Sequence, residues 1–274
     1  MLRNAPPVPR SRSAPWAWLG ACLGLMLALV TQAPAQWLAR GVANASQGRV
    51  LLNAPQGTLW QGSAQLTLSG GQPQHNAADN SDVALPSLLH WQLVPQWSRA
   101  LGLTLGLQLQ ADCCTTQPLE LALSPLWDGV RVDVNDQQSQ WPAQWLVGLG
   151  APWNTIQPQA QLQLRTQGLR WQTQSGQEQL QGLAELQVQQ LSTRLSTLRP
   201  LGSYRIQVRG GDTMAMTLDT LEGSLQLQGS GQWVNHRLHF QGEASAAPEF
   251  EAALSNLLNI LGQRRGHKSI MELS

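Results

Sequence analysis

Histidines and carboxylates are the side chains that could act as general acids, general bases or metal ligands in this chain, and they are dispersed along it. Only His236 and His239 are close in sequence, and three residues apart in a predicted strand they point to opposite faces. Asp128, Asp133 and Asp136 flank a predicted hairpin turn, where local hydrogen bonding accounts for them. The sequence holds no glycine-rich phosphate loop, nucleophile elbow or paired His-Glu motif. We therefore expect no enzyme activity, no catalytic residue, no cofactor and no metal site. The remaining histidines are His75, His90 and His267.

Cys113 and Cys114 are adjacent, whereas Cys22 lies in an apolar run. The Cα atoms of an ordinary disulfide lie farther apart than one peptide unit allows, so an adjacent pair forms an ordinary bridge only with distortion. Two states fit the pair: a strained vicinal disulfide or two free thiols. No partner ligands stand at a suitable spacing for metal binding. We expect no functional role for the pair.

One short motif, Gly57-Thr58-Leu59-Trp60-Gln61-Gly62, stands out from the surrounding pattern. The glycines allow the backbone to kink, or another segment to approach closely, on either side of Trp60. We expect a bulged start of a strand from which Trp60 projects as an anchor. No reaction follows from this motif.

The N-terminus combines a cationic tip with an uncharged apolar run, Trp16 to Val30. A membrane span needs about 20 mostly apolar residues, which residues 14–35 supply if the polar end lies at the interface. We interpret residues 1–13 as a cytoplasmic tip and 14–35 as a transmembrane anchor. The alternatives are a cleaved signal peptide, indicated by Ala33-Pro34-Ala35, and a lipoprotein signal ending at Cys22. The positive-inside rule then predicts that residues 36–274, which we expect to form a β-rich periplasmic domain, lie outside the cytoplasm in a periplasm-like space.

Composition excludes a nucleic-acid footprint, because charged residues are 12% of the chain and the net charge is +1. Polar positions carry Gln, Ser, Thr and Asn instead. Tryptophan dominates the aromatic residues, with 12 Trp against 2 Phe and 1 Tyr. Because Trp combines a large apolar body with one donor, we expect most of these side chains in the core or along a groove.

Period-two alternation of apolar and polar residues dominates from Leu51 to Phe240. The run from Leu101 to Leu109 is the longest example. Turn residues separate the runs, as expected for successive antiparallel hairpins. The apolar face requires either a closed sandwich or a strongly curved, incompletely closed sheet, and we favour the curved sheet. Predicted turns include Ser69-Gly70-Gly71, Asp128-Gly129, Ser175-Gly176, Gly210-Gly211-Asp212 and Gly229-Ser230-Gly231; Gly71 to Pro86 is predicted to be a loop.

Helices are predicted at the ends of the domain, at Pro34 to Ala45 and at about residues 248–261. Pro248 stands at a first helical position and Gly262 follows the last turn. One apolar stripe marks this C-terminal helix as amphipathic. We interpret it as a helix that packs on the sheet; the alternative is a docking helix for another subunit. The stripe consists of Phe250, Leu254, Leu257, Leu258 and Leu261.

Taken together, these motifs resemble type II secretion system protein N, the general secretion pathway N family. Gly57-Thr58-Leu59-Trp60-x-Gly62 is similar to its entry motif, and Leu89 to Leu93, with Trp91 inside and Pro95 after it, is similar to its next strand. The ending from Ala247 to Arg264 resembles its terminal helix and glycine-arginine tail. The loop at Gly71 to Pro86 and the cysteine pair depart from the family pattern.

The resemblance implies a single-pass inner-membrane protein with a periplasmic domain, accompanying the machine that exports folded proteins through an outer-membrane secretin. It implies other subunits of that machine as partners, in the inner-membrane platform or the secretin, and carries over no catalytic residue. An exposed sheet edge or an apolar groove would provide the contact. The alternative function is a periplasmic lipid or lipoprotein carrier, because a half-open apolar sheet can hold acyl chains.

Overall fold

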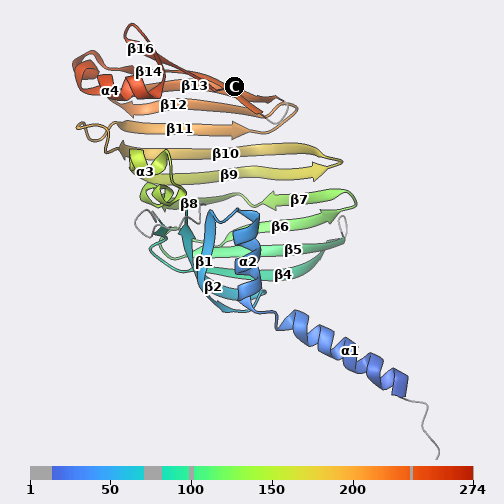
Figure 1. Cartoon of the computed structure of the whole chain (residues 1–274). Helices are drawn as coiled ribbons and strands as arrows, with labels where there is room; N and C mark the ends of the chain where they lie inside the picture. Colours follow the sequence, from blue (N-terminus) through green and yellow to red (C-terminus); the bar gives the residue numbers. More distant parts are fainter. Residues whose placement is uncertain (1–13, 71–81, 99–101, 235–236, 274) are drawn as a thin grey trace, which may run out of the picture.

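A computed structural model describes residues 14–70, 82–98, 102–234 and 237–273, and its body is one large antiparallel sheet (Figure 1). The sheet has 16 strands in the described residues and does not close on itself, which confirms the mainly β, incompletely closed prediction. The strands are β1 (Val50–Gly57), β2 (Gln61–Leu68), β3 (Val83–Ala84), β4 (Leu89–Ser98), β5 (Gly102–Ala111), β6 (Leu119–Leu126), β7 (Gly129–Val134), β8 (Gln137–Pro142), β9 (Gln159–Gln174), β10 (Gln177–Ser192), β11 (Gly202–Arg209), β12 (Ala215–Gly223), β13 (Leu225–Val234), β14 (Arg237–Ala246), β15 (Gln263–Arg265) and β16 (Lys268–Leu273).

The helices are short and lie at the ends of the chain or between β8 and β9. They are α1 (Ala14–Thr31), α2 (Ala35–Ala45), the 3-10 helix η1 (Ala143–Leu149), α3 (Trp153–Ile156), the 3-10 turn η2 (Pro248–Phe250) and α4 (Glu251–Leu261). Helices were predicted at 34–45 and at about 248–261, and both are confirmed.

Strands follow one another in the sheet nearly in chain order, from β1 at one end to β15 and β16 at the other. Because consecutive strands are antiparallel, their turns alternate between two edges of the sheet. The last residues of β4, β6, β9, β11 and β13 and the first residues of β5, β7, β10, β12 and β14 lie at one edge, which we call the tip edge (Figure 1). The β1–β2 turn lies on the same side of the sheet but is level with Gln92, before the end of β4 at Ser98. Residues at neighbouring tips therefore lie side by side although they are distant in sequence.

A bulge in β9 keeps the apolar side chains on one face along its 16 residues. Leu164 pairs with Leu186, and Trp171 pairs with Leu180, but the register shifts between these pairs. Gly168 has a φ of +54° at this shift. Since one extra residue in β9 reverses the alternation, even-numbered apolar positions before the bulge and odd-numbered ones after it face the same side.

Two separate hydrophobic clusters lie on the inner face of the sheet, one at each end. The first lies beneath α2, which contributes Ala35, Leu38, Ala39 and Val42, the spacing of one helix stripe. The second lies beneath α4 and includes the fully buried Leu254. Helices therefore cover the apolar face at the two ends of the sheet.

The N-terminal helix α1 ends at Thr31, and the chain then enters the domain, where Ala33 and Ala35 are buried. In the described part of the chain, no helix combines the length and hydropathy that a membrane span requires. The anchor at 14–35 stays a prediction, and the tip at 1–13 lies outside the described residues. The large apolar side chains of α1 that the structure describes, from Trp18 to Val30, are 47–74% exposed.

The predicted turn Gly229-Ser230-Gly231 is wrong, because all three residues lie inside β13. The aromatic ring of Phe240 occupies the space where a side chain at Gly229 would stand. Gly231 is the direct cross-strand partner of Phe240. These glycines make room for an aromatic ring within the sheet instead of marking a turn.

Two other boundaries differ from the predictions. The end of the predicted loop at 71–86 forms the short strand β3, which pairs with β2 and is followed by the buried Leu85. Residues 71–81 of that loop lie outside the described part. Beyond α4, β15 and β16 form a hairpin around Gly266, whose φ is +62°, where the sequence predicted only a tail.

Candidate functional site

The motif at 57–62 forms the tight turn between β1 and β2. Gly57 adopts a φ of +87°, a conformation that favours glycine. The amide of Thr58 donates to the carbonyl of Gln61 at 2.9 Å, and the amide of Gln61 donates back to the Thr58 hydroxyl at 3.2 Å. The predicted kink at the start of a strand is therefore a closed hairpin turn with its polar groups paired.

Gly62 and Trp91 explain the second glycine of the motif. Trp91 lies directly opposite Gly62 in the β2–β4 ladder, is 3% exposed, and fills the space that a side chain at position 62 would need. The indole Nε1 of Trp91 donates to the carbonyl of Leu59 at 3.1 Å. The two strands that carry the family-like motifs thus meet at one tightly packed point.

The same turn holds the junction between α1 and α2. The indole Nε1 of Trp60 donates to the carbonyl of Val30 in the last turn of α1 at 2.8 Å. The amide of Leu59 donates to the carbonyl of Ala33 at 2.7 Å, and Pro34 forms a β-bridge with Thr58. Carbonyl groups at a helix C-terminus lack partners within the helix, so these donors satisfy groups that would otherwise require water. The 57–62 turn therefore fixes where α1 leaves the domain.

The predicted stripe of the C-terminal helix packs on the sheet. Leu254 and Leu258 are 0% exposed and Leu257 is 6% exposed, whereas Ile260 on the same helix is 64% exposed. Phe250 and Leu261 are partly buried against the same cluster. The Ser269 hydroxyl of β16 donates to the Leu258 carbonyl at 2.6 Å, so the C-terminal hairpin holds this helix in place.

Tyr204 is a buried polar member of this cluster that sequence reasoning did not single out. It is 2% exposed, and its hydroxyl donates to the carbonyl of Leu225 at 3.0 Å. Burial raises the pKa of the Tyr204 phenol well above its ordinary value of 10.0, because the charged form would lose its hydration. As the only tyrosine of the chain, it could have been marked as unusual from composition alone.

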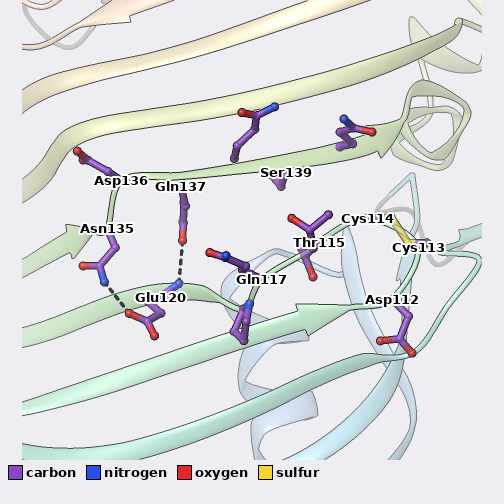
Figure 2. A pocket seen from close by; sticks show the side chains of 14 residues that line it. Asp112, Cys113, Cys114, Thr115, Gln117, Glu120, Asn135, Asp136, Gln137 and Ser139 are labelled. Carbon is purple, nitrogen blue, oxygen red and sulfur yellow. Dashed lines mark hydrogen bonds between the residues drawn. A yellow bond between two sulfur atoms is a disulfide. The ribbon is translucent and has the colours of Figure 1, made fainter.

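The cysteine pair forms a vicinal disulfide between Cys113 and Cys114, with Cα atoms 3.7 Å apart. It lies at one end of a cleft of about 650 Å³ between the β5–β6 loop and β8 (Figure 2). The Gln140 amide donates to the Cys114 carbonyl at 2.8 Å and closes this end. At the other end, the Asn135 side-chain amide donates to Glu120 at 2.6 Å.

Amide, hydroxyl and carboxylate side chains line this cleft. Among the residues that the structure describes, no group of three or more histidine, cysteine or carboxylate side chains could hold a metal ion. The carboxylate of Glu120 accepts hydrogen bonds from the side-chain amides of Gln108 and Asn135, and the described cleft residues form no nucleophile–base pair. The cleft has the chemistry of a polar binding surface.

On the outer face of the sheet, Glu185 is held by a network of uncharged donors. Gln207 and Gln187 each donate a 2.7 Å hydrogen bond to its carboxylate, and Arg205 approaches to 3.7 Å. These hydrogen bonds, with the arginine charge, hold the pKa of Glu185 below its usual value. Glutamine side chains on this face therefore stabilise the charged form of a carboxylate by donating hydrogen bonds to it.

The other sequence-predicted polar residues are not brought together. His90 and His239 are exposed on different strands, and His267 contacts Glu251 at 2.9 Å. His75 and His236 lie outside the described residues. Asp133 pairs with Arg170 and Asp128 accepts from Ser175 at 3.0 Å, as expected of turn and strand contacts.

Between the two clusters, the inner face carries a row of half-buried apolar side chains. Leu164, Leu186, Ile206 and Leu218 are consecutive cross-strand partners on β9 to β12. The row continues the apolar face beyond the ends that α2 and α4 cover.

A family model described as type II secretion system, protein N, matches residues 48–270. This range includes the 57–62 turn, Trp91, the apolar row and α4. No curated protein and no solved structure gave a significant match.

Proposed function

Because the chain belongs to the type II secretion system protein N family, we propose that it is a non-catalytic inner-membrane component of that system, with a periplasmic sheet that binds other subunits. Family membership supports a role in type II secretion and protein transport, in contact with other subunits. The membrane and periplasmic parts of the proposal rest on the cationic tip, the apolar helix α1 and the absence of a second apolar run in the sequence. The partners we propose are periplasmic segments of the inner-membrane platform or the secretin.

The observation that carries this proposal is the connection between α1 and the sheet. Trp60 and Leu59 bind backbone carbonyls at the end of α1 and beyond it, so the turn that the family-like motif builds positions the whole sheet relative to that helix. A component that has to present a binding surface at a fixed height above a membrane needs its sheet to be tied to its anchoring helix.

Secretion of a reporter exoenzyme tests the proposal. We expect Trp60→Arg to lower secretion, because the substitution removes the indole donor to Val30 and weakens the junction. Leu257→Lys should lower it as well, by placing a charge in the cluster beneath α4. Trp153→Arg is the matched control, since Trp153 is 36% exposed on α3 at the opposite edge from the turn.

Immunoblots of the envelope fraction separate loss of the protein from loss of its function. Trp60→Arg present at normal abundance with reduced secretion supports the proposal. Normal secretion from both Trp60→Arg and Leu257→Lys would contradict it.

A second candidate function, lipid carriage, is favoured by the apolar row on the inner face. Acyl chains are a suitable occupant for a half-buried aliphatic surface. A photo-reactive amino acid at Leu186, on this face, is expected to cross-link to lipid in cells, whereas the same group at Gln187, on the outer face, should not. Lipid adducts at neither position would remove this candidate.

A further inference from the structure

Two tryptophans at neighbouring tips of the sheet are among the most exposed large apolar residues of the described chain. Trp127, in the turn between β6 and β7, is fully exposed, and Trp97, near the end of β4, is 79% exposed. Leu103, at the start of β5, is 56% exposed. No hydrogen bond in the described structure uses either indole nitrogen. Large apolar side chains gathered in this way on a surface indicate that something covers them.

The strand register places these residues at adjacent strand ends on the same edge of the sheet. Trp97 is the direct cross-strand partner of Leu103 in the β4–β5 ladder. Leu105 pairs with Leu123, so Leu103 and Pro125 follow two residues further along their strands toward the tips. Trp127 follows Pro125 in the β6–β7 turn. We call Trp97, Leu103, Pro125 and Trp127 the tip patch.

The tip patch lies on the same side of the sheet from which α1 leaves. The 57–62 turn that binds the end of α1 is the β1–β2 turn, and it points to the same side of the sheet as the ends of β4 and β6. Trp60 is tied to β4 through the hydrogen bond from the Leu93 amide to its carbonyl, four residues before Trp97. Figure 1 shows α1 directed away from the body at the end of the sheet that holds β1, β2 and β4. The exit of the apolar helix and the patch therefore lie on the same side of the sheet, with the turn level with Gln92 and the patch further along β4.

Lipid is the occupant that fits both features. The side chains of α1 from Trp18 to Val30 are apolar and exposed, so α1 needs an apolar surrounding, which a bilayer supplies. Tryptophan is the residue that prefers the headgroup region, where its ring lies in an apolar layer and its N–H meets water or headgroup oxygens. The tip patch offers two such residues on the side of the sheet from which α1 leaves.

We propose that the tip patch is a bilayer-contact surface, which places Trp97, Leu103 and Trp127 in the headgroup region of the membrane that α1 enters. This inference rests on the anchoring part of the proposed function. It adds a second contact between the protein and the membrane. The tip patch would then restrict the orientation of the sheet, which would otherwise be free to rotate about the α1–α2 junction.

The test uses the full chain in proteoliposomes of phosphatidylethanolamine and phosphatidylglycerol. In a Cys22→Ser background, which removes the only free cysteine of the described chain, single cysteines are introduced by Trp97→Cys or Trp127→Cys and labelled with an environment-sensitive fluorophore. Trp153→Cys is the control, since Trp153 lies at the opposite edge. We expect a blue-shifted emission and quenching by quencher-bearing lipids at positions 97 and 127, and a water-like emission without quenching at position 153.

Three outcomes would overturn the inference: water-like emission at 97 and 127, equal quenching at all three positions, or protection at 97 and 127 only after other secretion subunits are added. Failure of the chain to float with the liposomes would overturn it together with the anchoring proposal. A water-like signal at the tips combined with reduced secretion by Trp60→Arg would reject the bilayer contact while the proposed function stands.

Discussion

At the scale of single residues, Gly62 shows how little space the motif leaves. A Cβ atom at Gly62 would lie 2.5 Å from the Cζ2 atom of Trp91, a buried ring that cannot move freely. We therefore predict that Gly62→Ala lowers the free energy of unfolding by about 1–3 kcal/mol, the usual cost of overpacking. Chemical denaturation followed by circular dichroism measures the effect.

Gly41 is the matched control for this prediction. It lies in α2 with nothing within 4 Å of its Cβ position, so Gly41→Ala should raise the free energy of unfolding by about 0.5–1 kcal/mol through helix propensity. Equal effects of the two substitutions would show that the Gly62–Trp91 contact is not tight in solution.

Tyr204 predicts a specific pH dependence. Because its folded pKa is raised above the ordinary value of 10.0, its contribution to stability is fully present below about pH 10 and is lost as pH rises above it. As the chain has 1 Tyr, phenolate absorbance reports this residue alone. We expect the phenolate signal to appear together with unfolding, and Tyr204→Phe to make stability less dependent on pH in the alkaline range. Phenolate absorbance that develops near pH 10 while circular dichroism stays native would contradict the buried placement.

At the scale of elements, the bulge between β9 and β10 predicts unequal effects of two glycines. Gly182 has a φ of +87°, and its Cβ position overlaps the carbonyls of Gly168 and Gln167, whereas Gly168 has a φ of +54° with nothing within 4 Å. Both substitutions to alanine carry backbone strain of about 1 kcal/mol or more. Gly182→Ala should destabilise the protein more, because it also has to displace backbone. Equal unfolding midpoints for the two variants in urea would contradict the bulge geometry.

Strands were predictable here because period-two patterns report a local property, the alternation of faces, and the runs around Leu103, Val132 and Ile206 all became strands. The predictions that failed concerned features that depend on contacts between residues distant in sequence. Gly229 and Gly231 indicate a turn when read locally, and only the ring of Phe240 from the next strand explains them. The motif at 57–62 was recognisable by its residues. Its hydrogen bonds to Val30 and Ala33 were not predictable, because the local sequence of a turn does not indicate which distant segment contacts it.

At the scale of the whole molecule, the two hydrophobic clusters predict that the ends of the sheet are stabilised separately. Each cluster has its own helix, and the strands between them share backbone ladders and a row of half-buried side chains. A sheet in which each strand contacts mainly its neighbours behaves like a repeat array, with stability transmitted from one unit to the next. The loss of stability caused by a substitution at one end of the sheet should therefore decrease within a few strands of that substitution.

Leu254→Ala and Leu85→Ala test this prediction as a reciprocal pair. Each residue is at most 1% exposed, one in the cluster beneath α4 and the other in the cluster beneath α2, and each substitution should cost about 2–5 kcal/mol locally. In hydrogen exchange read by mass spectrometry, we expect Leu254→Ala to speed exchange in β11 to β16 and leave β1 to β4 protected. Leu85→Ala should give the opposite pattern. If either variant accelerates exchange uniformly across the sheet, the two ends unfold as one cooperative unit. A destabilising substitution in α4 would then also destabilise the 57–62 turn.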